Sequence, residues 1–246
     1  MGYTVADPDG FLYACVGRYS ESLVLFDQVL LADPENTGAL LGKAAALDRM
    51  GRYADALAVI GKIHAIDRLQ SDAWYLEGFI LYHRGDLVQA LPCLKEALKL
   101  DPRHAEAWCA AGNCHYHLGE QDEAMECYDA AIRIDHVYPK AWYNKGVVLS
   151  DTRRYEEALL CYDEVLRLNP GVAAVWTNKG YCLAMTGRYQ DAVDAFTSAL
   201  EINPADITAW NDKAAALRRL GRDGEAEFCT RKVIEISRNR GPSLVL

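Results

Sequence analysis

The sequence predicts an all-α protein built as a linear array of helix pairs. Three observations predict it. The five tryptophans recur at one interval of 34 residues, two columns of small residues keep that interval, and apolar residues recur at helical spacing inside each repeat. The tryptophans are Trp74, Trp108, Trp142, Trp176 and Trp210. A fixed period of this size is typical of stacked supersecondary units, which bury their apolar faces against their neighbours.

Seven units follow from this period, without insertion or deletion, when counting begins at Tyr3. They span residues 3–36, 37–70, 71–104, 105–138, 139–172, 173–206 and 207–240. We expect one solenoid domain over residues 3–240, followed by a short apolar tail over residues 241–246.

The first helix of each unit carries the tryptophan and a small residue four positions later, as in Trp142 and Gly146. The small column reads Gly10, Ala44, Gly78, Gly112, Gly146, Gly180 and Ala214. Without a large side chain there, the two helices of a pair can approach closely. We expect the tryptophan to be buried over their contact, where its replacement by Ala costs about 3–5 kcal/mol.

The turn and the second helix follow in the same order in each unit. Five turns carry a glycine, which tolerates positive φ and can end the first helix, at Gly51, Gly85, Gly119, Gly187 and Gly221. In the fifth unit Ala158, Tyr162, Val165 and Leu168 then mark one face of the second helix. Asp or Asn ends each second helix of units one to six, and proline follows at Pro34, Pro102, Pro170 and Pro204.

The residues Trp176, Gly180, Tyr189, Ala192, Phe196, Ala199 and Pro204 form a pattern that resembles the tetratricopeptide repeat. The resemblance covers nearly the whole chain. It implies a right-handed superhelical solenoid whose first helices line the concave side. It is specific for the fold but not for the ligand, because such repeats bind many different partners.

The terminal units depart from the pattern. Unit one has Ala6 in place of tryptophan, and Asp7, Pro8 and Asp9 predict a helix start there. Unit seven has Asp223 and Thr230 at otherwise apolar positions, as expected for the polar outer face of a terminal repeat.

The composition narrows the class of function. Half of the residues are hydrophobic, yet no apolar run is long enough to span a membrane and no signal-peptide pattern opens the chain. Eight cysteines without a Cys-x-x-Cys pair, six of them in two repeat columns, indicate small apolar core residues and a reducing compartment. We therefore expect a cytoplasmic protein without membrane contact.

The charge is acidic and unevenly distributed. The net charge of −9 argues against a nucleic-acid partner. Residues 1–123 carry 10 basic and 18 acidic side chains, whereas residues 124–246 carry 16 and 17. This difference can steer a basic or bipolar ligand, and the alternative is an ordinary solvated acidic surface.

No sequence motif of catalysis is present, so we expect no enzyme activity and no cofactor. The one cluster of potential metal ligands contains His83, His117, His115 and Cys114. Neighbouring residues on a helix point in different directions, so these groups do not converge and we expect no metal.

The candidate binding groove lies on the first helices, on a stripe beside the tryptophan column. Its residues are Tyr75, Phe79, Tyr82, Asn113, Tyr116, Tyr143, Asn144, Asn178 and Tyr181. Aromatic residues with polar tips dominate many interfaces. Asn144 and Asn178 lie one repeat apart, and their amides can hold the backbone of an extended ligand. The alternative is that Phe79, Val147 and Tyr181 pack only between neighbouring first helices.

These observations favour a non-enzymatic scaffold that binds an extended or helical segment of a partner protein or peptide. Family members that clamp chaperone C-termini add basic residues, whereas the corresponding positions here are Cys109, Ala174 and Asn178, so we expect no acidic C-terminal tail as ligand. Two alternatives stay open. One is a regulatory or docking subunit of an enzyme complex, and the other is self-association through the C-terminal end with its tail Leu244, Val245 and Leu246.

Overall fold

The computed structural model describes residues 18–239, and within this range it contains thirteen α-helices and no strand. The helices are α2 (Tyr19–Ala32), α3 (Thr37–Arg49), α4 (Tyr53–Ile66), α5 (Ser71–Arg84), α6 (Leu87–Leu100), α7 (Ala105–Leu118), α8 (Gln121–Ile134), α9 (Pro139–Asp151), α10 (Tyr155–Leu168), α11 (Ala173–Met185), α12 (Tyr189–Ile202), α13 (Ile207–Arg219) and α14 (Asp223–Asn239). The all-α fold is confirmed. The features expected at residues 6–10 and in the tail 241–246 lie outside the described residues.

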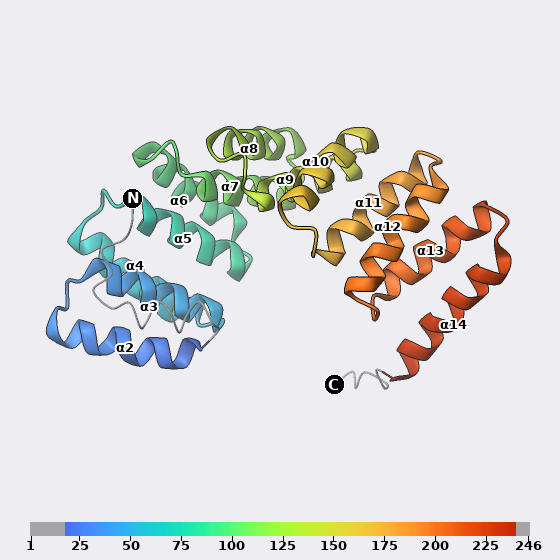
Figure 1. The fold of residues 1–246 in the computed structure, drawn as a ribbon. Helices are drawn as coiled ribbons and strands as arrows, with labels where there is room; N and C mark the ends of the chain where they lie inside the picture. Colours follow the sequence, from blue (N-terminus) through green and yellow to red (C-terminus); the bar gives the residue numbers. More distant parts are fainter. Residues whose placement is uncertain (1–17, 240–246) are drawn as a thin grey trace. The chain divides into compact units, whose positions relative to one another are not determined.

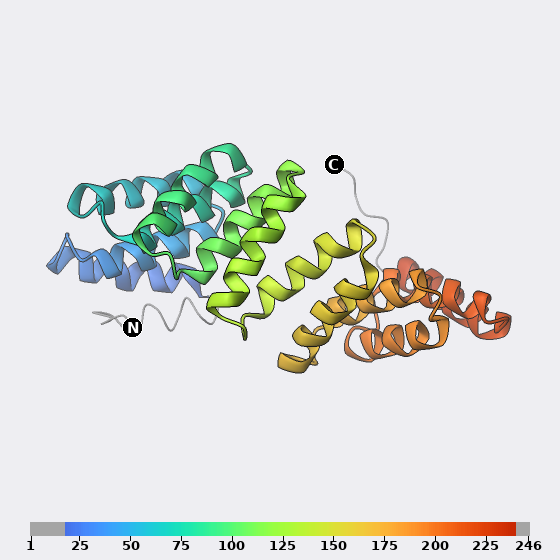
Figure 2. The same cartoon turned by 90° about the horizontal axis from the view of Figure 1, so that it is seen from above.

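The helices form two compact units, which we call the N-terminal unit (Met1–Ile134) and the C-terminal unit (Asp135–Leu246). The first holds α2 to α8 and the second holds α9 to α14. Within each unit consecutive helices run side by side in tandem (Figures 1 and 2). Each 34-residue repeat from the second to the seventh contains one helix pair, from α3/α4 to α13/α14. A single domain over residues 3–240 stays a prediction.

The small column allows close packing inside each pair, as expected. A Cβ atom built on Gly112 would lie 2.7 Å from the ring of Tyr128, and one on Gly180 would lie 2.6 Å from the ring of Phe196. Both rings are almost fully buried. Each aromatic side chain of the second helix therefore occupies the space that a larger residue on the first helix would need.

The glycine turns are also confirmed. All five predicted glycines have positive φ, between 72° at Gly221 and 94° at Gly85. In the fifth repeat the same position is Arg153, and it adopts the same left-handed conformation with φ of 62°. The geometry of the turn is thus retained even where the sequence offers no glycine.

The expectation of buried tryptophans is wrong. The indoles are only half-buried, and the fully buried position is the preceding small residue, such as Ala141 before Trp142. Each indole Nε1 donates to a backbone carbonyl six residues earlier, at 2.8 to 3.1 Å. The indole N–H needs an acceptor, and the loop between repeats supplies carbonyls outside a helix. The tryptophan therefore fastens this loop at the edge of the core.

The cysteines behave as small apolar residues, as predicted. Cys109, Cys114, Cys127, Cys161, Cys182 and Cys229 are buried, and Cys93 is half-buried. Burial raises the pKa of the thiols of Cys93, Cys114 and Cys127 to about 12. Among the described helices, none is long and apolar enough to cross a membrane.

Candidate partner-binding surfaces

The first helices of the N-terminal unit carry a continuous row of aromatic rings. On α5 the ring of Phe79 lies 5.6 Å from that of Tyr75 and 4.2 Å from that of His83, measured between centroids. The ring of Tyr82 lies 6.5 Å from that of Phe79. Tyr75, Phe79 and Tyr82 also pack against buried core residues. Their inner faces thus contribute to the core while their edges remain accessible.

The row continues onto α7 through His117. The hydroxyl of Tyr82 lies 3.1 Å from Nε2 of His117, and the ring of Tyr116 lies 5.2 Å from that of His117. We call Tyr75, Phe79, Tyr82, His83, Tyr116 and His117 the aromatic face. The sequence placed its aromatic members on this stripe, and the structure brings them together with two histidines.

A buried carboxylate fixes the orientation of His83. Both carboxylate oxygens of Asp48, on α3, lie 2.9 Å from Nδ1 of His83. Asp48 is only 4% exposed. Asp48 was not among the predicted site residues, although it lies one repeat before Tyr82 and therefore on the same stripe.

A pocket of about 340 Å³ adjoins the aromatic face at the beginning of α5 and α7. It is lined by Leu41, Gly42, Ala45, Asp72, Tyr75, Leu76, His104 and Glu106. The ring of Tyr75 lies 4.6 Å from that of His104. The pocket combines an aromatic wall with charged groups, which is a common composition for a side-chain binding site.

Two carboxylates flank the His104 ring in this pocket and favour its charged form. Its Nε2 lies 3.3 Å from Asp72 Oδ1 and its Nδ1 lies 3.3 Å from Glu106 Oε2. Burial alone lowers the pKa of His104, but the two carboxylates outweigh it and raise the pKa to about 9. Nε2 forms an ion-pair contact with Asp72 without the geometry of a hydrogen bond. His104 precedes α7 and lies outside the repeat columns, so the sequence pattern does not mark it.

The three asparagines have separate surroundings. Asn113 belongs to the N-terminal unit, and its Oδ1 accepts a hydrogen bond of 2.8 Å from the buried Tyr128 hydroxyl. Asn178 belongs to the C-terminal unit, and its Nδ2 donates to the hydroxyl of Tyr143 at 3.2 Å. Asn144 on α9 and Asn178 on α11 are both half-buried and lie in the same repeat column.

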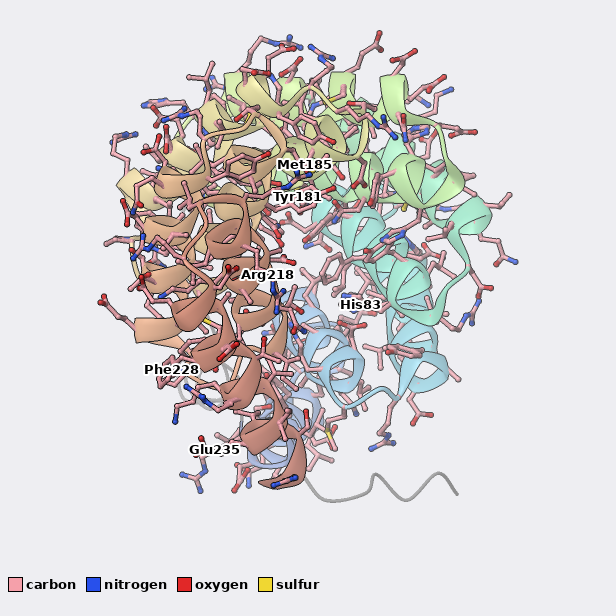
Figure 3. The ribbon with its side chains drawn as sticks, turned by 90° about the vertical axis from the view of Figure 1, so that its right-hand side faces the viewer. His83, Tyr181, Met185, Arg218, Phe228 and Glu235 are labelled. Atoms are coloured by element: carbon pink, nitrogen blue, oxygen red, sulfur yellow. The ribbon has the colours of Figure 1, made fainter. Side chains whose placement is uncertain are left out.

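The C-terminal unit exposes a second apolar surface on α11. Tyr181 is 42% exposed and Met185 is 50% exposed, and both belong to α11. Figure 3 labels the two side chains. They line a pocket of about 330 Å³ with Ala184, Tyr189, Phe196, Asp212, Ala215, Ala216 and Arg219. Burial, with a smaller effect of Asp206, raises the pKa of Asp212 above its usual range. Asp212 lies one repeat after Asn178, so extending the asparagine column by one unit would have found it.

The histidines and the cysteine considered as metal ligands engage different partners. His83 contacts Asp48, His117 contacts Tyr82, and Nδ1 of His115 lies 2.6 Å from Glu120 Oε2. Cys114 is buried in the core. Within residues 18–239 no three His, Cys, Asp or Glu side chains are grouped so as to hold a metal ion.

Comparisons with known proteins agree with this architecture. Three sequence models, each described as tetratricopeptide repeat, match residues 75–139 and 143–207, residues 16–78, and residues 207–240. None of the curated proteins matches the chain in sequence.

Similar folds occur among solved structures. A crystal structure of MamA has a TM-score of 0.65 and 20% identity, covering 72% of this chain and 96% of its own. MamA from Desulfovibrio magneticus RS-1 has a TM-score of 0.66 and 21% identity, and the match covers 70% of this chain and 97% of the MamA chain. YrrB, described as a tetratricopeptide repeat protein with an unusual peptide-binding site, has a TM-score of 0.65 and 22% identity, covering 75% and 93%.

Proposed function

Because the chain belongs to the tetratricopeptide repeat family, we propose that it is a non-enzymatic scaffold that binds an extended or helical segment of another protein. The observation that carries the proposal is the aromatic face, which places six rings in contact along α5 and α7. Tyrosine and histidine rings give a partner a large apolar area together with polar edges. Such residues supply much of the binding energy in protein interfaces.

The pocket around His104 supports a preference for a basic or bipolar segment. Asp72 and Glu106 surround one cation, so the pocket residues carry a net negative charge. The first half of the sequence is also the more acidic half. A lysine or arginine of the partner can reach these carboxylates while its apolar stem lies against Tyr75.

The C-terminal unit supplies a separate surface for the same kind of ligand. Tyr181 and Met185 offer exposed apolar area, and Asn178 offers an amide next to the Tyr143 hydroxyl. A peptide-binding site is named for YrrB, whose fold this chain shares. We propose that Asn144 and Asn178 orient a ligand through its backbone.

The absence of catalysis is part of the proposal. Burial raises the pKa of the cysteine thiols, which makes them poor nucleophiles at neutral pH. The histidines of the aromatic face are held by Asp48 and Tyr82.

The alternative, a docking subunit of an enzyme complex, would be favoured if a catalytic protein were recovered in stoichiometric amount with this chain. The buried thiols also fit a reducing, cytoplasmic environment.

The test is affinity capture from a lysate of the source organism, followed by titration of the identified partner against variants. We expect the double variant Tyr82→Ala, Tyr116→Ala to keep its helix content. Its affinity for the partner should fall by a factor of about ten or more. Leu31→Ala, which removes an 84% exposed side chain on α2, is the matched control and should bind normally.

The second pair to be tested is Asn144→Ala with Asn178→Ala. Helix content should be retained, with at most about 1 kcal/mol lost for the Tyr143 hydrogen bond, while partner affinity falls. Unchanged affinity in both double variants would contradict the proposed use of the first helices.

A second candidate function is self-association, and the last helix favours it. On α14 the side chains of Phe228 and Ile234 are 48% and 47% exposed, and Figure 3 shows the position of Phe228. Sedimentation of the wild type, of Phe228→Asp and of a chain lacking residues 241–246 would test it. A monomer in all three samples at micromolar concentration would exclude it.

A further inference from the structure

A polar cross-link recurs between the first helix of a repeat and the second helix of the repeat before it. Lys179 on α11 contacts Asp163 on α10 at 2.6 Å, and Lys213 on α13 contacts Thr197 on α12 at 2.8 Å. In the N-terminal unit Lys43 on α3 forms an ion pair with Asp27 on α2.

The next repeat of the N-terminal unit keeps a cross-link with other residues. Glu77 on α5 lies 2.8 Å from His64 on α4. One of the cross-linking groups also lies over the tryptophan of the later of the two repeats. The His64 ring lies 4.1 Å from that of Trp74, and the Lys179 ammonium lies 5.2 Å from the ring of Trp176.

The repeat formed by α7 and α8 is different. The residue that corresponds to Lys179 is Ala111, and the residue that corresponds to Asp163 is Lys95. Ala111 cannot reach across to α6, and Lys95 forms no ion pair with another described residue. The cross-link is therefore missing, and Trp108 lines an open groove between α6 and α8.

This α6–α8 groove is large and apolar. Its volume is about 860 Å³, against about 460 Å³ for the corresponding space at Trp176. It is lined by Val88, Leu91, Pro92, Lys95, Leu98, Lys99, Trp108, Ala111, His115 and Cys127. The lining at Trp176 instead contains Asp163, Lys179, Arg188, Asp191 and Asp194. A volume of this size accepts several apolar side chains of a helix rather than one.

The charged groups of the groove lining are cationic. Lys95 and Lys99 stand on α6, and only Lys99 has an ion-pair partner, the exposed Glu96 at 3.3 Å. They belong to the half of the chain in which acidic residues outnumber basic ones by 18 to 10. The α8 side is not cationic, because Glu123 and Glu126 lie near Cys127. The two lysines of the groove lining thus lie on its α6 side.

Pro92 removes one backbone donor from α6 at the edge of the groove. A proline inside a helix has no amide proton, so the carbonyl four residues earlier loses its helical donor. That carbonyl belongs to Val88, whose side chain is 74% exposed.

We infer that the α6–α8 groove is a second docking surface, which receives an amphipathic helix of a partner protein with acidic residues along the edge that faces α6. Apolar side chains of that helix fill the space over Trp108, and its carboxylates pair with Lys95 and Lys99. On α7 this surface involves Trp108, Ala111 and His115, whereas the aromatic face uses Tyr116 and His117. The inference does not depend on the proposed function of the aromatic face.

The test uses a phage-displayed library of random 16-residue peptides selected on the immobilised full chain. The closing variant is Lys95→Asp with Ala111→Lys, which installs the residues that form the cross-link between α10 and α11. Because Lys already occupies this column at Lys145, Lys179 and Lys213, the variant should fold, and circular dichroism and thermal melting check this. We expect the selected peptides to combine apolar residues at helical spacing with Asp or Glu. Their affinity for the closing variant should be lower than for the wild type by a factor of about ten or more.

Two further variants separate the surfaces. Lys179→Ala changes the corresponding position of the C-terminal unit, and Tyr82→Ala with Tyr116→Ala changes the aromatic face. Peptides of the groove should bind both with wild-type affinity. The inference is overturned if no peptide is enriched, if the enriched peptides lack acidic residues, or if the folded closing variant binds them as tightly as the wild type. Loss of binding in the aromatic-face variant alone would assign the peptides to the aromatic face and would also overturn it.

Discussion

At the scale of single residues, the distance between paired helices depends on a glycine and the ring that lies against it. A Cβ at position 180 would lie 2.6 Å from the ring of Phe196, which is fully buried. A contact that short forces the ring or the helix to move, and a packed core resists such movement. The glycine is therefore required by packing, although alanine is the better helix former.

We predict that Gly180→Ala lowers the free energy of unfolding by about 1–3 kcal/mol, because overpacking outweighs the gain in helix propensity. Gly61→Ala is the control, since no atom lies within 4 Å of the added Cβ, and it should be neutral or stabilising. Urea unfolding followed by circular dichroism measures both. Equal stability of the two variants would contradict the packing argument.

The charge of His104 makes part of the stability depend on pH. Its pKa is raised from 6.5 to about 9 in the folded protein. The folded state therefore binds the proton more tightly than the unfolded state. The stabilisation is complete below about pH 6.5 and is lost as the pH rises to 9.

We predict that wild type loses about 1–2 kcal/mol more than His104→Gln between pH 6.5 and pH 9, after allowance for partial solvent screening of the pair. Melting curves of both proteins across this pH range give the two changes in stability. Groups that titrate in both proteins contribute equally, so their effect cancels when one change is subtracted from the other. Parallel stability profiles would show that Asp72 and Glu106 do not hold the charged form.

At the scale of the helical element, the tryptophan connects successive repeats. Its indole donates to the loop that precedes its own helix, as in the 2.9 Å bond from Trp176 to the Pro170 carbonyl. The ring is half-buried and also carries the ammonium of Lys179 over its face. Its contribution therefore comes from three modest interactions rather than from complete burial.

We predict that Trp176→Phe costs about 1 kcal/mol, because it removes the indole hydrogen bond and keeps much of the apolar contact. Trp176→Ala should cost about 2–3 kcal/mol, which is less than the value for a fully buried ring. Chemical denaturation of the two variants measures both changes. Equal costs would mean that the ring surface contributes nothing beyond the hydrogen bond.

At the scale of the whole molecule, the repeats resemble one another in backbone but not in the surfaces they present. The pairs α5/α6 and α11/α12 share the same turn and the same glycine contact with the second helix. Yet one first helix presents Tyr82 and His83, and the other presents Tyr181 and Met185. Specific recognition therefore depends on positions that the repeat leaves variable.

Much of the fold was predictable because its determinants act over short distances in sequence. The period of 34 residues gave the helix pairs, and local steric rules gave the turns at Gly51, Gly85, Gly119, Gly187 and Gly221. The aromatic members of the aromatic face were predictable for the same reason, since helical spacing fixes which side chains share a stripe. The Arg153 turn was not, because neighbouring repeats impose its conformation against local preference.

The sequence by itself determined the class of fold, the pairing of helices and the stripe on which candidate binding residues lie. Only the tertiary structure decided that the tryptophans are half-buried, that His104 lies between Asp72 and Glu106, and that the α6–α8 groove is open. Each of these properties depends on side chains from more than one structural element. Their contacts are set by side-chain orientation and packing across repeats, and a pattern within one repeat does not specify these.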